Sequence, residues 1–299
     1  MNHSSRISRP LLSALVCVLL ALAWLLASCD SDDSGGTFAL PPPQPLVHPA
    51  DCTLVLVPAG PVVLGNVPEG WGNYQVTPEV VPVDSFYLER YEVSNLRYAA
   101  YLAAALDSGL VEYDGQNVYQ VSTGKLLLRT AAAESRLQYV DSLDTFVAEA
   151  GYENLPVALV SWYGAQAFAE FYGRRLPTEV EWEKAARGTV DLFGKVDGVG
   201  VGYPYPWGDQ APNAQLANFD SGLGGLEVVQ SYPQGMSWYG AFNMGGNAWE
   251  WTATANGSSR VRRGGSYLSS AEMLLTAARF FSDPAITDKA IGFRCAMDP

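Results

Sequence analysis

Histidine is almost absent from this sequence. The 299 residues contain only His3 and His48, so the stretch from Asp51 to Pro299 has no imidazole at all. This excludes a Ser-His-Asp triad, a zinc site with histidine ligands and a histidine/carboxylate iron site from that stretch.

Cysteine and basic residues are also few. Cys17 and Cys29 belong to an apolar N-terminal stretch, which leaves Cys52 and Cys295 for the rest of the chain. Two thiols cannot complete a four-cysteine zinc or iron–sulfur site. Eighteen Lys and Arg face 31 Asp and Glu, which gives a formal net charge of −13. Such a surface repels polyphosphate, so we expect no nucleic-acid partner.

The N-terminus has the pattern of a secretory signal peptide. A short basic start precedes the apolar run 11–27, which ends in the letters LASC at Cys29. This ending resembles a bacterial lipobox and predicts a lipoprotein signal peptide over 1–28 with a lipid on Cys29. The alternative is an uncleaved anchor, but 17 apolar residues are at the short limit for spanning about 30 Å of hydrocarbon. We therefore expect a protein of the bacterial cell envelope, lipid-anchored on the extracytoplasmic side of a membrane.

Beyond the leader, the pattern predicts a tether and one domain. Residues 29–50 are acidic and then proline-rich, as in an extended tether. Residues 51–299 predict a single compact α+β domain with much irregular structure. Residues 54–64 suggest a hairpin broken at 58–60. Helices are expected after the N-caps Ser94 and Ser161, and after Thr178, which forms a capping box with Glu181.

Four segments carry a family resemblance. They are LVPAGPVVLG near residue 60, PVALVSWYGAQAFAEFYGRRLPTEVEWEKAARG at 156–188, YPYPWGDQAPNAQLANFD at 203–220, and GAFNMGGNAWEWTA followed by RVRRGGSY and GFRC. In this order they resemble the sulfatase-modifying factor family, also called the formylglycine-generating enzyme family. The resemblance covers residues 51–299 and implies a mixed domain of low regular secondary structure, similar to C-type lectins.

The resemblance implies calcium in the segment NMGGNAWEW. The matching ligand positions are Asn243, Gly246, Ala248 and Glu250. Amide, carbonyl and carboxylate oxygens suit calcium. In the alternative, Asn243 and Glu250 only hydrogen-bond the loop. A second calcium site maps less completely, to Asn218 and the carbonyl of Phe219, because the chain is shortened where its other ligands would lie.

Family members that form formylglycine use two cysteines, which bind copper(I). Here Ser269 stands at the first position and the second falls near Leu274. A serine hydroxyl is a poor ligand for a soft metal, so copper is not expected. The resemblance also places a cleft near Trp249, Ser266, Tyr267 and Ser269. It further suggests a disulfide between Cys52 and Cys295, because the first and last strands lie side by side in lectin-like folds.

Two functions remain open at this point. The first is a binding or assembly protein that holds a peptide, an exported protein or a glycan in the family cleft. The second is an enzyme: an oxidase of the formylglycine-generating type with unconventional residues, or a related enzyme that oxidises an exported protein, as in tyrosine-derived chromophore maturation. No histidine or assignable lysine accompanies Ser269, which argues against nucleophilic catalysis.

Overall fold

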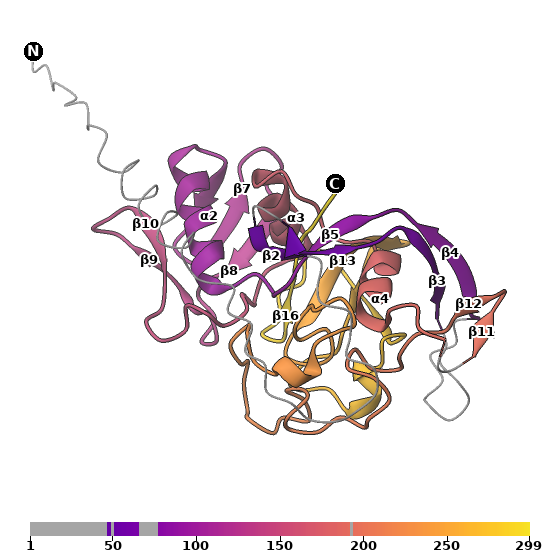
Figure 1. Cartoon of the computed structure of the whole chain (residues 1–299). Helices are drawn as coiled ribbons and strands as arrows, with labels where there is room; N and C mark the ends of the chain where they lie inside the picture. The colour runs from indigo at the N-terminus through magenta and orange to yellow at the C-terminus, as the bar shows by residue number, and fades with distance from the viewer. Residues whose placement is uncertain (1–46, 49–50, 66–76, 192–193) are drawn as a thin grey trace, which may run out of the picture. The chain divides into compact units, whose positions relative to one another are not determined.

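The beginning and the end of the described chain meet in one sheet (Figure 1). The computed structural model describes residues 47–48, 51–65, 77–191 and 194–299. The strands β1 (Val47–His48), β2 (Asp51–Val57), β5 (Phe86–Glu89) and β17 (Ala296–Met297) form this sheet in that order. The strand β5 pairs antiparallel with both β2 and β17 and therefore separates them.

A second four-stranded sheet carries the motif segments of the C-terminal half. Its order is β15 (Arg279–Ser282), β14 (Ser259–Arg263), β13 (Trp249–Asn256) and β16 (Ile291–Gly292). The β13–β16 pair is parallel, with Trp249 opposite Ile291. Segments about 40 residues apart in the sequence thus lie side by side in this sheet.

The remaining strands form small antiparallel groups. They are β3 (Gly60–Leu64) with β4 (Glu79–Val83); β6 (Val111–Tyr113), β7 (Asn117–Gln120) and β8 (Leu126–Arg129); β9 (Leu137–Val140) with β10 (Thr145–Ala148); and β11 (Lys195–Val196) with β12 (Val199–Gly200). The expected hairpin over 54–64 is wrong, because β2 pairs with β5 and β3 pairs with β4. Two short apolar runs separated by a turn did not reveal that each has a more distant partner.

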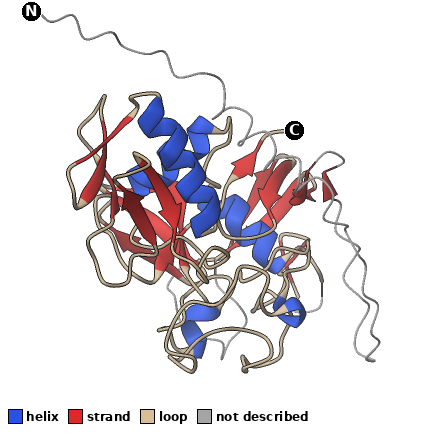
Figure 2. Ribbon diagram, turned by 90° about the vertical axis from the view of Figure 1, so that its left-hand side faces the viewer, coloured by secondary structure: helices blue, strands red, loops and turns tan. Residues whose placement is uncertain are grey.

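Three helices begin at the N-caps that the sequence predicts (Figure 2). They are α2 (Asn95–Asp107), α3 (Trp162–Phe171) and α4 (Glu179–Arg187), capped by Ser94, Ser161 and Thr178. The capping box of α4 is complete, since Thr178 and Glu181 each bond the other's backbone N–H. Short 3-10 turns occur at Pro233–Gly235 and Ala271–Leu274. The expected α+β class with low regular content is confirmed.

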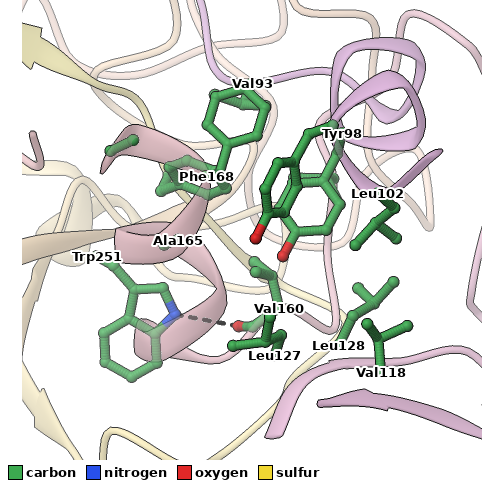
Figure 3. Close-up of a cluster of buried hydrophobic side chains, with 14 of the residues drawn as sticks. Val93, Tyr98, Leu102, Val118, Leu127, Leu128, Val160, Ala165, Phe168 and Trp251 are labelled. Atoms are coloured by element: carbon green, nitrogen blue, oxygen red, sulfur yellow. Dashed lines mark hydrogen bonds between the residues drawn. The ribbon is translucent and has the colours of Figure 1, made fainter. Parts of the chain in front are cut away.

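The larger core packs α2 and α3 against strands from both halves of the chain (Figure 3). Phe168 of α3 stacks on Tyr98 of α2 with ring centroids 5.6 Å apart. Trp251 of β13 donates from its indole to the carbonyl of Val160 at 3.2 Å. A Cβ at Gly164 would come within 2.2 Å of the Leu127 carbonyl oxygen, so α3 can approach β8 this closely only with glycine there.

A second core surrounds α4 and contains buried charges. Trp182 is fully buried, and Glu183 and Arg187, one helical turn apart, are both inaccessible to solvent. Arg263 of β14 completes this group through an ion pair of 2.8 Å with Glu183. The helix therefore docks through ion pairs as well as apolar contacts.

No helix among the described residues is both long and apolar enough to cross a membrane. The predicted signal peptide, the lipidated Cys29 and most of the tether fall outside the described residues.

Candidate functional site

Ser266 and Ser269 lie in one buried turn after β14. Gly264 and Gly265 have φ values of 96° and 75°, which turn the chain where a side chain would be strained. The Ser266 N–H donates to Ser269 Oγ at 2.9 Å, and the two hydroxyl oxygens are 3.3 Å apart. Both serines are buried. The turn therefore uses the Ser269 hydroxyl to hold its own backbone.

Tyr267 lies within this turn, whereas Trp249 lies at the start of β13. The Trp249 ring is buried, 5.0 Å from Phe280, and the Arg262 guanidinium lies 5.2 Å above it. The Tyr267 N–H donates to the Asn247 carbonyl at 2.8 Å. Burial raises the pKa of the Tyr267 phenol, although Lys289 acts in the opposite direction. The structure thus brings three of the four predicted cleft residues into one turn and places Trp249 under an arginine.

A cavity of about 190 Å³ opens beside Tyr267. Its wall combines aromatic, amide and charged side chains with a glycine-rich stretch at 224–225, and includes Asn95, Glu134, Arg136, Tyr152, Tyr267 and Lys289. Lys289 Nζ lies 3.8 Å from Glu134 Oε1, and the Arg136 guanidinium lies 4.0 Å from the Tyr152 ring. Charges of both signs beside aromatic faces suit recognition of a polar ligand. The sequence indicated Tyr267 but not the other residues of the cavity wall, most of which lie far away in the sequence, between 95 and 158.

The predicted calcium ligands Asn243 and Glu250 contact different partners. Glu250 receives hydrogen bonds from Arg294 Nε at 2.7 Å, from Arg294 Nη2 at 2.6 Å and from the Trp182 indole at 2.7 Å. The Asn243 side-chain N–H instead donates to Glu92 at 2.8 Å. Gly246 and Ala248 lie between them in the same buried loop. A guanidinium thus already neutralises the Glu250 carboxylate, which does not fit the role of a calcium ligand in this arrangement.

Glu92 is a buried acid that the sequence did not single out. Its carboxyl oxygens accept from Asn243 at 2.8 Å and from Asn247 at 2.9 Å. Both asparagines have left-handed backbones, with φ of 55° and 60°. The pKa of Glu92 is raised to about 8, chiefly by burial; Arg294 opposes this, the negative charge of Glu250 adds to it, and the hydrogen bonds from Asn243 and Asn247 lower it. In the sequence, Glu92 begins the segment EVSN before a helix, and no motif there indicates a buried acid.

Asn218 and Phe219, the weaker predicted calcium ligands, lie next to this network. The Asn218 amide donates to the Gly225 carbonyl at 2.8 Å and to Asn247 at 3.2 Å. Its Oδ1 is buried and has no hydrogen-bond partner among the described residues. The Phe219 carbonyl accepts from Gly222 at 3.1 Å. An orphaned amide oxygen fits a cation ligand, since burying it unbonded costs free energy.

The cysteine positions differ from expectation. Leu274, near which the second family cysteine position falls, is fully buried and packs with Leu275, Ala278 and Tyr205. Cys295 is a buried thiol, and burial raises its pKa well above the ordinary value. The first and last strands do not lie side by side as expected, because β5 lies between β2, which holds Cys52, and β17, which follows Cys295. The Cys52 side chain lies outside the described part of the chain, so the Cys52–Cys295 disulfide stays a prediction.

Comparison with known sequences agrees with this arrangement of motifs. Residues 37–299 match the family of the sulfatase-modifying factor enzyme 1-like domain. The chain is 30% identical to a formylglycine-generating enzyme of Mus musculus, covering 86% of this chain and 77% of that protein. It is 37% identical over 161 residues to the inactive C-alpha-formylglycine-generating enzyme 2 of Mus musculus, covering 48% and 49%. A serine/threonine-protein kinase pkn1 of Chlamydia pneumoniae is 31% identical over 86% of this chain, which spans only 39% of that longer protein.

Solved structures show the same fold. PvdO from Pseudomonas aeruginosa superimposes with a TM-score of 0.57 at 18% identity, covering 82% of this chain and 94% of that chain. At this identity the likeness concerns the fold alone. The match over residues 37–299, together with the motif order, shows that the chain belongs to the sulfatase-modifying factor enzyme 1-like family.

Proposed function

We propose that this chain is a binding protein of its family, and that it does not oxidise cysteine to formylglycine. The observation that carries the proposal is Ser269, which stands where the resemblance places the first catalytic cysteine and whose hydroxyl is held by Ser266 in a buried turn. A hydroxyl neither binds copper(I) well nor passes through a disulfide.

The second cysteine position supports the same proposal. Leu274 has no accessible surface and packs among apolar side chains, so this position presents neither a thiol nor space for a reacting group. The printed name of one relative describes an inactive formylglycine-generating enzyme 2, and that relative matches about half of this chain.

The cavity beside Tyr267 is the proposed binding site for a segment of an exported peptide or protein. The Glu134–Lys289 ion pair in its wall is long, at 3.8 Å, and both side chains are exposed. A charged ligand can therefore replace one partner of this ion pair at little cost in free energy. The Tyr152 and Tyr267 side chains supply aromatic contact area in the same wall.

A mass measurement tests the proposal. The protein is incubated with copper(I), oxygen and a sulfatase peptide of the pattern CxPxR, with the mouse formylglycine-generating enzyme as positive control. We expect the mass of the peptide to stay unchanged. Formation of formylglycine would remove the thiol sulfur and two hydrogens from the cysteine and add one aldehyde oxygen. Appearance of the aldehyde peptide in this chain's reaction, at a rate that Ser269→Ala abolishes, refutes the proposal and supports the oxidase.

Calcium binding is a separate part of the proposal. The orphaned Oδ1 of Asn218 supports it, whereas the Arg294-paired carboxylate of Glu250 does not. A calcium ion that binds only the folded protein raises its melting temperature. We expect a chelator to lower the melting temperature of the wild type but not of Asn218→Ala. An unchanged wild-type melting temperature after chelation refutes the site.

Attachment to a membrane rests on the LASC pattern alone. We propose that Cys29 carries the lipid and becomes the first residue of the mature protein, which then sits in the bacterial envelope facing away from the cytoplasm. Mass spectrometry of the protein from membranes should find an acylated N-terminal cysteine, and Cys29→Ala should release the protein from the membrane fraction. A wild-type protein with an unmodified N-terminus contradicts this.

A further inference from the structure

The outer side of α3 carries a groove made of two adjoining cavities. One is about 290 Å³ and is lined by Gln120, Thr123, Lys125, Trp162, Tyr163 and Gln166, among others. The other is about 270 Å³ and is lined by Tyr101, Leu110, Val121, Ser122 and Phe171, among others. Gln120, Ala167 and Glu170 belong to both. The groove shares no lining residue with the cavity beside Tyr267.

The middle of this groove presents paired donors and acceptors. Gln166 donates to Glu170 at 2.6 Å, and Thr123 donates to Gln120 at 2.7 Å. Among the described contacts, these bonds leave the Gln120 amide N–H groups and the Gln166 carbonyl available. Neighbouring sugar hydroxyls each donate and accept one hydrogen bond, so side-chain amides and a carboxylate match them.

The backbone around the groove is already hydrogen-bonded. The Gln120 N–H donates to the Lys125 carbonyl, and the Val121 N–H donates to the Leu110 carbonyl. The strand β7, which ends at Gln120, lies between β6 and β8 and has no open edge here. A peptide that binds by adding a strand would find no free main-chain groups on β7. The side-chain amides therefore favour a ligand recognised through hydroxyl groups.

One end of the groove is apolar and accessible. Leu110 and Val121 are 51% and 52% exposed, and Phe171 is 38% exposed. The Phe171 ring is held edge-on to Tyr101 with centroids 5.3 Å apart. Exposed large apolar side chains gathered at one place mark binding surfaces. The C–H face of a sugar ring can pack on them while its hydroxyls face the amides.

The other end is lined by the cation Lys125, and Arg260 stacks on the ring of Trp162, which lines the same end. The Lys125 ammonium lies 4.9 Å from the Tyr163 ring, and the Arg260 guanidinium lies 4.0 Å from the Trp162 ring. Neither has an ion pair among the described residues, although most other basic side chains there do. In a chain of net charge −13, unpaired cations fixed on aromatic rings favour an anionic group on the ligand.

We propose that the groove along α3 binds an acidic oligosaccharide, one that bears carboxylate or sulfate groups. Its sugar rings pack at Phe171, its hydroxyls bond Gln120, Gln166 and Glu170, and its anionic group sits at Lys125. This site is separate from the cavity of the proposed function, and either can exist without the other.

Calorimetric titration tests the site. The probes are an oligogalacturonate, a heparin-derived oligosaccharide, cellohexaose and poly-L-glutamate. The variants are Lys125→Gln and Phe171→Ala, with Lys195→Gln as the matched control, because Lys195 is an exposed lysine elsewhere. Lys289→Gln probes the cavity beside Tyr267. Melting temperatures establish that each variant is folded.

We expect at least one acidic saccharide to bind. Lys125→Gln and Phe171→Ala should each weaken that binding about tenfold, whereas Lys195→Gln and Lys289→Gln leave it unchanged. Absence of binding by both acidic saccharides overturns the proposal. The proposal is also overturned if poly-L-glutamate binds equally well, or if Lys125→Gln leaves saccharide binding intact. If only Lys289→Gln weakens binding, the saccharide binds in the cavity beside Tyr267 and not in this groove.

Discussion

Glu92 should make this protein less stable as the pH rises. Its carboxyl group is 1% exposed and is held by two amide groups rather than by a direct cation. Burial raises its pKa from 4.5 to about 8. An acid whose pKa is higher in the folded state keeps its proton on folding, so its stabilising effect is complete below the unfolded pKa and is lost as the pH rises through the folded one.

The magnitude follows from the difference between the two pKa values. Each unit corresponds to about 1.4 kcal/mol, so the shift of Glu92 corresponds to about 5 kcal/mol between pH 4.5 and pH 8. Glu92→Gln removes the titration and preserves the shape. The variant loses one acceptor for the Asn243 and Asn247 amides, which costs about 1–3 kcal/mol at every pH.

Urea unfolding at pH 5, 6, 7 and 8 measures this effect. Other acids titrate in both proteins, so the quantity of interest is the difference in unfolding free energy between wild type and Glu92→Gln. We expect the wild type to be the more stable at pH 5 and to lose that advantage by pH 8. A difference that stays constant across the range would refute the reasoning, and so would one that grows with pH.

Three other changes test the packing. Glu183→Gln should destabilise the protein by about 3–5 kcal/mol in urea unfolding, because it leaves Arg263 buried with less compensating charge. Gly164→Ala should lower the melting temperature strongly or prevent folding, because the added Cβ has no room between α3 and β8. Thr178→Ala should cost about 1 kcal/mol in urea unfolding through loss of the α4 cap.

Matched controls separate these effects from general fragility. Gly222→Ala adds a Cβ whose nearest neighbour is 3.5 Å away and should change the melting temperature little. Thr123→Ala removes an exposed hydroxyl and should leave stability near the wild type. If Gly164→Ala has the same melting temperature as Gly222→Ala, the close approach of α3 to β8 does not require glycine at this position. If Thr178→Ala is as stable as Thr123→Ala, the cap of α4 does not contribute the expected stability.

The sequence predicts the local elements well because their signals are local. Ser94, Ser161 and Thr178 are hydroxyl residues placed directly before apolar helical patterns, and each does cap a helix. Motif strings long enough to be unmistakable also indicated the family and its fold. These features depend on residues within a few positions of one another.

Pairings between distant segments could not be predicted in the same way. The hairpin expected after β2 and the expected side-by-side placement of the first and last strands both failed, because β5 takes the neighbouring place in the sheet. In the sequence, the carboxylate oxygens of Glu250 looked free to bind calcium. In the structure they accept hydrogen bonds from Arg294, which lies 44 positions away. Glu92 gave no pattern, since its asparagine partners are more than 150 positions away.

The guanidinium of Arg294 joins segments that lie far apart in the sequence. It donates to the carbonyls of Glu89 and Arg90, which lie 205 and 204 positions earlier, as well as to Glu250. Contacts between such distant segments require closure of a very long loop and slow the search for the native state. Glu89 belongs to β5 in one four-stranded sheet and Glu250 to β13 in the other, so a single buried guanidinium ties the two sheets together. A substitution at Arg294 would therefore remove a shared support from both sheets and leave the Glu250 carboxylate buried without its cation.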